Sequence, residues 1–421
     1  MKMGEKGRTV RLGIIGLGGR GMGQLETILQ MPDIEVPVVC DVYEDRIEKG
    51  IELVKKYKEN TPNGVKDYHE VLRRDDVEAV FVFSSWETHI EICVESMLAG
   101  KPVATEVGGA SSVEECWKLV RTYEQTGIEC MMLENCCYNK EEMTLLNMIR
   151  QGMFGTVVHC QGGYEHDLRD EIGNGDINRH YRQRHFLHRN GELYPTHELG
   201  PIAKYLNLNR GNRMVSLVSM SSKAAGLNEW LKEHRTDNGQ LMNAQVNEGD
   251  IVTTMIKCAN GETILLTHDC TLPRPYSRGG RIQGTKGIWM EDNRSIFIEG
   301  RTVSDPKHWT HTWESDKAYM EEFEHPLWKE YREFGLRGGH GGMDYLVLRA
   351  FVESVQKHEV PPIDVYDTAS WMCITALSEQ SIAMGSLPVS VPDFTEGKWL
   401  NREKRPADMF SLDEITYAAF D

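Results

Sequence analysis

A glycine-rich turn near the N-terminus constrains the fold of this chain more than any other feature. Gly16-Leu-Gly-Gly-Arg-Gly21 matches the pattern GxGxxG, follows the apolar run Val10–Ile15 and precedes a helical pattern over Gly23–Met31. In that context the first glycine allows a tight turn, the second lets the backbone approach a pyrophosphate, and the third lets helix and strand pack closely. The helix N-terminus offers free N–H groups to phosphates. The sequence therefore predicts a dinucleotide-binding fold.

An acidic residue supports this prediction and indicates which dinucleotide is bound. Asp41 closes the second apolar strand, Ile34–Cys40, and stands about 20 positions after the last glycine of the turn, the spacing expected for such an acid. A carboxylate there accepts hydrogen bonds from the adenosine ribose and repels a 2′-phosphate. We therefore expect NAD as the cofactor, in preference to NADP.

The first third of the chain alternates continuous apolar runs with helical patterns. Such runs are typical of parallel strands that are covered on both faces by helices. We therefore expect a Rossmann fold, a doubly wound parallel sheet, over residues 1–150. The later strands of this pattern are Val77–Phe83, Lys101–Thr105 and Glu129–Leu133, and helices are expected at His89–Leu98 and Val113–Gln125.

The pattern changes after about residue 155, where long alternating strands begin. The hairpin around Asn260-Gly261 carries the dipeptide that favours a type I′ turn. We expect residues 151–421 to form an α+β domain with an open, mostly antiparallel sheet, and its C-terminal tail to pack back on the body. The expected strands are Thr156–Tyr164, Asp250–Lys257, Glu262–His268, Arg281–Gly284 and Gly287–Met290, and the expected helices are Glu141–Arg150 at the boundary, Met343–Lys357 and Thr368–Met384.

Composition excludes several classes of partner. The chain has 47 Lys and Arg against 64 Asp and Glu, a formal net charge of −17, which argues against binding to nucleic acid or to an anionic membrane. No apolar run approaches the roughly 20 residues of a membrane-spanning helix. We expect a soluble protein, cytoplasmic as given, and periplasmic or exported if a leader has been removed. The ten cysteines form no CxxC pair, and no metal site is predicted.

Four side chains in the second half are candidates for proton transfer: Tyr164, Tyr194, His197 and Tyr276. Tyr194 and His197 are three residues apart, and a helix starting near Pro195 would place both on one face. The helix dipole disfavours a charged imidazole there, so His197 could act as a general base. Glycines precede Tyr164 and a proline precedes Tyr276, which indicates shaped loops. Taken singly, each aromatic residue is also compatible with ordinary packing.

An ordered set of short segments resembles known families. The chain resembles the Gfo/Idh/MocA superfamily, whose oxidoreductases carry Glu-Lys-Pro where this chain has Glu106-Val107-Gly108, without the lysine that assists hydride transfer. It resembles glycoside hydrolase family 109, the NAD-dependent α-N-acetylgalactosaminidases, more closely. The segments are Ser85–His89, Glu106-Val107, Glu134–Tyr138, Gly162–Tyr164, Tyr194–His197, Asn209–Arg213 and Pro275-Tyr276.

The resemblance implies roles for individual residues. The NAD site would include the turn residues Gly16, Gly18, Gly19, Arg20 and Gly21, with Asp41, Ser85, Trp86, Glu87, Thr88, His89, Glu106, Val107, Asn135, Arg182, Tyr194 and His197. The sugar would face Tyr164, Tyr194, His197 and Tyr276, which are also the expected catalytic residues. The division of roles among the three tyrosines stays open.

The resemblance also implies a reaction. Terminal N-acetylgalactosaminides or related hexosaminides would be hydrolysed through oxidation at C3, deprotonation at C2, elimination, water addition and re-reduction, with no net redox change. One alternative is a net NAD-dependent oxidoreductase acting on a sugar or cyclitol. Another is a non-catalytic sugar- or NAD-binding regulator. The open sheet makes a homodimer the expected assembly.

Overall fold

The computed structural model describes residues 7–302, 313–405 and 408–415. The chain forms two compact units: Met1–Asn147 with Glu324–Ala369 and Glu403–Asp421, and Met148–Phe323 with Ser370–Arg402. The sequence predicts one boundary near residue 150; in the structure two later segments also belong to the first unit. Helix α6, Lys140–Arg150, lies where the chain leaves that unit.

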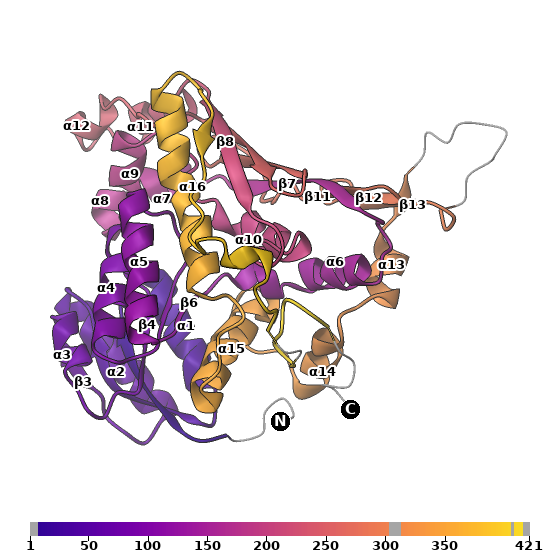
Figure 1. Ribbon diagram of the computed structural model, residues 1–421. Helices are drawn as coiled ribbons and strands as arrows, with labels where there is room; N and C mark the ends of the chain where they lie inside the picture. Colours follow the sequence, from indigo (N-terminus) through magenta and orange to yellow (C-terminus); the bar gives the residue numbers. More distant parts are fainter. Residues whose placement is uncertain (1–6, 303–312, 406–407, 416–421) are drawn as a thin grey trace. The chain divides into compact units, whose positions relative to one another are not determined.

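The first unit is built on a six-stranded sheet in the order β3-β2-β1-β4-β5-β6, with every pair parallel (Figure 1). Most residues of these strands are buried, as their continuous apolar character predicts. The predicted Rossmann sheet is confirmed. Its strands are β1 Val10–Ile15, β2 Ile34–Cys40, β3 Asn63–Val65, β4 Ala79–Val82, β5 Val103–Thr105 and β6 Cys130–Met132.

Helices follow most strands of this sheet. The first begins at Gly19, four positions before the predicted start, because the glycine turn itself supplies its first turn. Helix α5 begins with a capping box, in which the Ser112 hydroxyl accepts from the Glu115 N–H and the Glu115 carboxylate accepts from the Ser112 N–H. The helices are α1 Gly19–Leu29, α2 Glu44–Tyr57, α3 Tyr68–Leu72, α4 Trp86–Leu98, α5 Val113–Thr126 and the 3₁₀ turn η1 Asn135–Tyr138.

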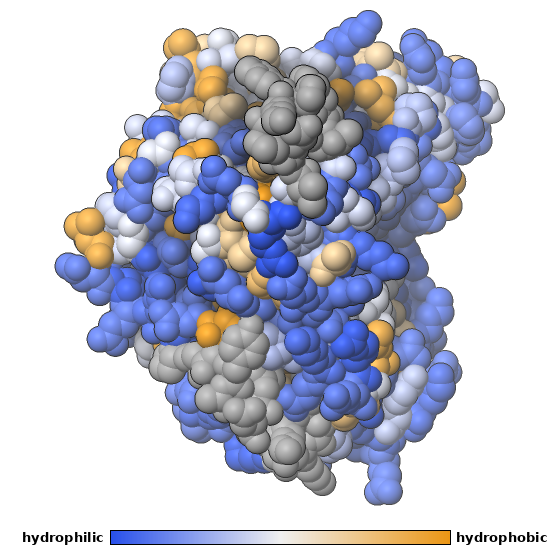
Figure 2. Space-filling view, turned by 90° about the vertical axis from the view of Figure 1, so that its right-hand side faces the viewer, coloured by the Kyte–Doolittle hydropathy of each residue, from blue (hydrophilic) through white to orange (hydrophobic). Residues whose placement is uncertain are grey.

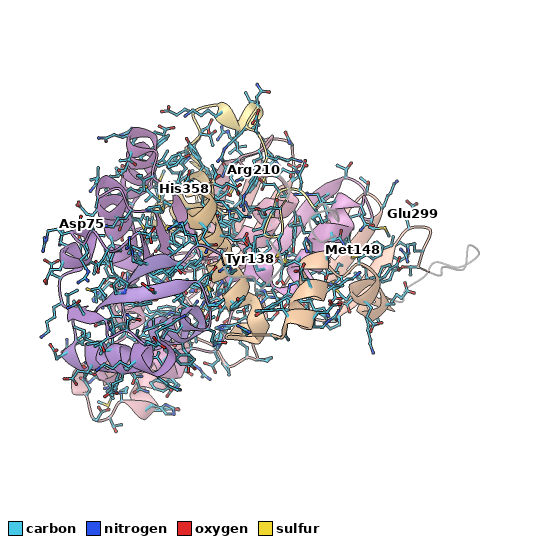
Figure 3. All side chains as sticks on the ribbon, turned by 90° about the horizontal axis from the view of Figure 1, so that it is seen from below. Asp75, Tyr138, Met148, Arg210, Glu299 and His358 are labelled. Atoms are coloured by element: carbon cyan, nitrogen blue, oxygen red, sulfur yellow. The ribbon has the colours of Figure 1, made fainter. Side chains whose placement is uncertain are left out.

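A late segment of the chain returns to the first unit. It contains α14 Pro326–Phe334, the 3₁₀ turn η2 His340–Gly342 and α15 Met343–Lys357, which packs against α1 and η1. Tyr138, labelled in Figure 3, is completely buried and its hydroxyl donates to the Phe410 carbonyl at 2.8 Å. That bond ties the end of the described chain to the same core.

The second unit is built on a nine-stranded sheet in the order β14-β13-β12-β11-β7-β10-β9-β8-β15 (Figure 1). All neighbouring strands are antiparallel except β7 and β10, so the predicted open, mostly antiparallel sheet is confirmed. Its strands are β7 Val157–Glu165, β8 Met214–Ser221, β9 Ile251–Cys258, β10 Thr263–Asp269, β11 Arg281–Gly284, β12 Gly287–Met290, β13 Ser295–Ile298, β14 Glu314–Ser315 and β15 Val389–Ser390.

The hairpin between β9 and β10 is present, but the predicted type I′ turn is wrong. That turn needs positive φ at both central residues, whereas Gly261 has φ +108° and Asn260 is not among the positive-φ residues of the described chain. The Gly261 N–H donates to the Cys258 carbonyl at 3.2 Å. The loop is therefore one residue longer than a two-residue hairpin loop, and Gly261 supplies the unusual backbone angle.

Helix α10 covers one face of this sheet by packing on β7. On the other face, Met220 and Met255 are exposed, and Val218 and Leu265 are half-buried.

The remaining helices are α7 Arg169–Gly173, α8 Gly175–Asn178, α9 Arg182–His188, α10 Thr196–Tyr205, α11 Gly226–His234, α12 Gly239–Met242, α13 Lys317–Glu322, α16 Val365–Ala383 and the 3₁₀ turn η3 Lys398–Leu400.

The surface agrees with the charged composition. The face drawn in Figure 2 is mostly hydrophilic, with apolar residues in small separate groups. Across the described ranges, no helix has both the length and the apolar character to cross a bilayer.

Candidate active site

The glycine turn of the first unit has the geometry of a phosphate-binding loop. Gly16 has φ +94°, and a Cβ on it would overlap the backbone of Phe83 and Ser84. A Cβ on Gly21 would overlap the Gly16 carbonyl, so α1 and β1 approach as closely as the pattern requires. Beside Gly19, by contrast, no atom of the described residues other than its chain neighbours and its own helix backbone lies within 4 Å of a Cβ position. The turn therefore leaves open space at the N-terminus of α1, where a pyrophosphate would bind.

Asp41 lies at the end of β2, beside this turn. Its carboxylate accepts from the Leu17 N–H at 2.7 Å and the Tyr43 N–H at 3.0 Å. Each oxygen keeps a lone pair for a ribose hydroxyl, so the donor and acceptor set fits NAD. Arg46, which sequence analysis did not identify, lies 3.8 Å from the same carboxylate and stacks over the Tyr43 ring.

The segment Ser85–His89 begins α4 at the carboxyl end of β4, where ligands of such sheets bind. Its members have different surroundings. His89 is completely buried, its Nε2 lies 3.0 Å from the Ser84 carbonyl, and burial lowers its pKa. A neutral, buried imidazole of this kind holds the loop in place. Trp86 packs against Gly108, where a Cβ would come within contact of the indole.

A cluster of charged groups surrounds Arg20. Its guanidinium donates to Glu106 at 2.8 Å and to both oxygens of Asp344 at 2.9 and 3.0 Å. Asn135 Nδ2 also donates to Asp344, at 2.7 Å, and His340 Nδ1 lies 2.8 Å from it. Burial alone would raise the pKa of Asp344, but the His340 hydrogen bond and the Arg20 charge hold it well below its ordinary value.

Three residues predicted for the cofactor site, Arg20, Glu106 and Asn135, are therefore brought together by a fourth that sequence analysis missed. Asp344 comes from α15, more than 200 positions from the nearest of the three. The only signal was the glycine-rich stretch Gly338–Gly342 just before that helix.

In the second unit, the four candidate proton-transfer residues form one aromatic cluster. Tyr164 lies on β7, Tyr194 lies just before α10, His197 lies in its first turn, and Tyr276 lies in the loop after β10. Ring centroids are 4.4 Å apart for Tyr164 and Tyr194, 4.8 Å for Tyr194 and His197, and 6.3 Å for Tyr164 and Tyr276. The rings of Tyr194 and His197 are in contact, but Tyr194 precedes α10, so the two do not share a face of one helix as predicted.

The glycines before Tyr164 have another explanation than a shaped loop. Gly162 and Gly163 lie inside β7, and a Cβ on Gly162 would overlap the Glu198 side chain of α10. A Cβ on Gly163 would overlap the Thr267 backbone of β10. The glycines therefore let a helix and a strand approach β7 closely, and this brings Tyr164 against α10.

Arg182 supplies positive charge to the cluster. It is buried, and its guanidinium carbon lies 5.1 Å from the centre of the Tyr194 ring and 5.6 Å from that of Tyr164. Burial raises the pKa of Tyr164, while Arg182 acts in the opposite direction. Tyr164 is therefore a neutral phenol at rest, with a cation in place to stabilise its phenolate.

Another group missed by sequence analysis surrounds the chain just before the Tyr194–His197 segment. Glu192, Glu248 and His268 are completely or almost completely buried. His268 Nδ1 lies 3.2 Å from Glu248, whose other oxygen accepts from the Gly191 N–H at 2.9 Å. Burial raises the pKa of Glu192 to about 7, against the opposing charge of His268. These groups anchor the chain just before the aromatic cluster.

Two family models together match most of this chain. Residues 138–401 match the model of the glycosyl hydrolase 109 C-terminal domain, and residues 10–133 match that of the oxidoreductase family with an NAD-binding Rossmann fold. The chain belongs to glycosyl hydrolase family 109. This family-109 chain is 38% identical to a protein of Tannerella forsythia named alpha-N-acetylgalactosaminidase, over 95% of the chain and 89% of the relative.

Other matches agree with the family and the fold. The family-109 protein of Stenotrophomonas maltophilia is 41% identical, over 94% of this chain and 92% of its own length. A solved levoglucosan dehydrogenase, in complex with NADH and levoglucosan, matches with a TM-score of 0.66 and 16% identity, over 92% of this chain and 100% of that one. The latter likeness shows the fold alone. The predicted family is confirmed, and family 109 membership supports glycoside hydrolase activity on a Gfo/Idh/MocA-type fold.

Proposed function

We propose that this protein hydrolyses terminal N-acetylgalactosaminides or related hexosaminides with NAD as a bound cofactor and no net oxidation. The observation that carries the proposal is the cluster of three tyrosines and one histidine around Arg182. Phenols and imidazoles move protons, whereas most glycosidases stabilise an oxocarbenium ion with two carboxylates. The names of the relatives support the sugar class.

The first unit would hold the cofactor. Its contacts would come from the turn Gly16–Gly21, Asp41, the segment Ser85–His89 and the group around Arg20. When bound, NAD would accept the hydride of C3 and return it after cleavage. While C3 is a ketone, the neighbouring C2–H is acidic.

The aromatic cluster would carry the protons. His197 takes the proton of the C3 hydroxyl as that carbon is oxidised. Tyr164 or Tyr194 first releases its phenol proton to solvent, and the resulting phenolate, stabilised by Arg182, then removes the C2 proton. The electron pair of the broken C2–H bond forms the C1–C2 double bond as the C1–O bond breaks.

The leaving oxygen needs a proton, and Tyr276 is placed to give it. Tyr276 is 47% exposed, far more than Tyr164 or Tyr194, which suits contact with an aglycone that extends into solvent. Water then adds at C1 and gives one proton to the Tyr276 phenolate, while C2 takes a proton that has exchanged with solvent. The C1–C2 single bond is thereby restored.

The test compares sugar release with NADH accumulation by the wild type and by His197→Ala, with aryl N-acetylgalactosaminides as substrates. We expect the wild type to release sugar without steady NADH accumulation. We expect His197→Ala to lose about 10²–10⁴-fold in kcat, the usual contribution of a general base, while NAD stays bound. The exposed His234 provides a control, since its replacement should leave turnover unchanged. Full activity of His197→Ala would refute the assignment, and steady NADH accumulation would favour a net oxidoreductase.

We also propose that the half-exposed sheet face of the second unit pairs two copies. Exposed Met220 and Met255 on this face would be covered in a dimer. Sedimentation at micromolar concentration should give a dimer mass, and a monomer at all concentrations would contradict this.

A further inference from the structure

A second arginine contacts the aromatic cluster at Tyr276. Arg278 follows Tyr276 by two positions and is only 6% exposed. Its Nη1 donates to the Tyr276 hydroxyl at 3.3 Å, and its guanidinium carbon lies 5.9 Å from the centre of that ring. The buried cation therefore acts on the phenol oxygen itself.

Glu198 holds this guanidinium from the other side. It is the residue after His197 in α10, is 4% exposed, and its Oε2 lies 3.6 Å from Arg278 Nε. The absence of a side chain at Gly162 makes room for it against β7. A buried guanidinium needs such a partner, because an uncompensated charge in the interior is strongly unfavourable. Glu198 also links the Tyr276 loop to the helix that carries His197.

We propose that Arg278 is a positioning residue for Tyr276, with Glu198 orienting its guanidinium. The pair directs the Tyr276 hydroxyl and stabilises the phenolate that forms when Tyr276 gives its proton to the leaving glycosidic oxygen. This role for Tyr276 rests on the proposed function, whereas the contact between Arg278 and Tyr276 does not.

The physical reason is that Arg278, a buried cation, donates a hydrogen bond directly to the phenol oxygen of the half-exposed Tyr276. A hydrogen bond from a buried guanidinium to an oxygen that becomes an anion grows stronger as the proton leaves. Arginine suits this position because its planar fork can face a carboxylate through Nε and a phenol through Nη1 at once. The two arginines would thus divide the tyrosines: Arg182 serves the pair that faces C2, and Arg278 serves the leaving-group acid.

The same loop contains a matched control. Arg274 is two residues before Tyr276, forms an ion pair with Asp269 at 2.7 Å and another with Glu165. Its guanidinium also donates to the Pro275 carbonyl at 3.2 Å. Arg274→Gln therefore removes one charge from the same loop without removing the contact to the Tyr276 hydroxyl.

The first test measures the phenol directly and does not depend on activity. 3-Fluorotyrosine is placed at position 276 of the full-length holoprotein, and its ¹⁹F resonance is followed against pH in the parent, in Arg278→Gln and in Arg274→Gln. Loss of the Arg278 cation should move the titration midpoint up by roughly 0.5 pH unit, because solvent screens the charge at a phenol that is 47% exposed. Arg274→Gln should move it much less. Equal midpoints in the parent and Arg278→Gln would overturn the proposal.

The second test measures the consequence for cleavage. With a series of aryl N-acetylgalactosaminides, Arg278→Gln should lower kcat most for the poorest leaving groups, with little change in KM and with partial rescue by Arg278→Lys. In a Tyr276→Phe background the same substitution should add little further loss. An equal loss for every leaving group, with or without Tyr276, would indicate a merely structural role and refute the proposal. If the wild type cleaves none of these substrates, the proposed function fails, and the ¹⁹F titration still decides the link between Arg278 and Tyr276.

Discussion

At the scale of single residues, buried titratable groups make the region around the chain just before the aromatic cluster sensitive to pH. The pKa of Glu192 is about 7 in the folded protein, above its ordinary value of 4.5, because burial penalises its charge. The pKa of Glu248 is also raised by burial. A group whose pKa is higher in the folded protein than in the unfolded chain makes its full contribution to the free energy of unfolding below its unfolded pKa. That contribution is lost as the pH rises through its folded pKa. For Glu192 that window runs from about 4.5 to about 7.

This predicts a specific change in the pH dependence of stability. The melting temperature of the wild type should fall between about pH 4.5 and about pH 7 more steeply than that of Glu192→Gln, which cannot ionise. Calorimetric melts of both proteins across this range give the comparison, and the exposed Glu233→Gln provides the control. Parallel pH curves for wild type and Glu192→Gln would mean that Glu192 does not titrate in this window.

Residues also differ in how far sequence could predict them. Gly16, Gly21 and Asp41 follow a local spacing that reports a backbone requirement, so the pattern predicts their positions in the fold. Asp344 and Arg278 were missed because their partners are set by tertiary contacts. Arg278 is only two positions from Tyr276, but its pairing with Glu198 crosses from a loop to a helix. The spacing of residues along the chain does not indicate such tertiary pairs.

At the scale of elements, helix α15 adds a residue to the predicted cofactor site, because the late chain segment that contains it belongs to the first unit. Asp344, in the first turn of this helix, binds Arg20 and Asn135. We expect Asp344→Asn to weaken NAD binding about tenfold, or about 1.4 kcal/mol, because the arginine loses its doubly bonded partner.

Calorimetric titration of NAD into cofactor-stripped protein measures this effect without reference to turnover. Asp75→Asn is the matched control, since Asp75 is exposed at the outer edge of the first unit (Figure 3). An unchanged dissociation constant for Asp344→Asn would show that this helix does not support the cofactor site.

Most long elements were predicted, although the eight-residue strand β8 was missed, and most short elements were not, for a physical reason. The buried strands and α15 have hydrophobic patterns that extend over several turns or residues, so their own sequence determines them. The short helices α7, α8 and α9 and the two-residue strands β14 and β15 form where tertiary contacts support them, and no periodic signal marks them. The parallel pairing of β7 with β10 inside an antiparallel sheet likewise depends on the arrangement of the whole unit.

At the scale of the whole molecule, the proposed reaction draws on both units. The first supplies the dinucleotide turn, and the second supplies the aromatic cluster and its two arginines. Sequence predicted the two folds, because each has its own hydrophobic pattern. It did not predict that residues 324–369 and 403–421 belong with the first unit. The residue composition does not change where the chain passes from one unit to the other.

The most direct test of this account is the fate of the C2 hydrogen during cleavage in heavy water. Elimination through a C3 ketone removes that proton, and reprotonation then draws on the solvent. We predict that the sugar released over many turnovers carries deuterium at C2, as read by NMR of the product. A product that retains its original hydrogen at C2 would contradict the central claim that glycosidic cleavage runs by transient oxidation and elimination.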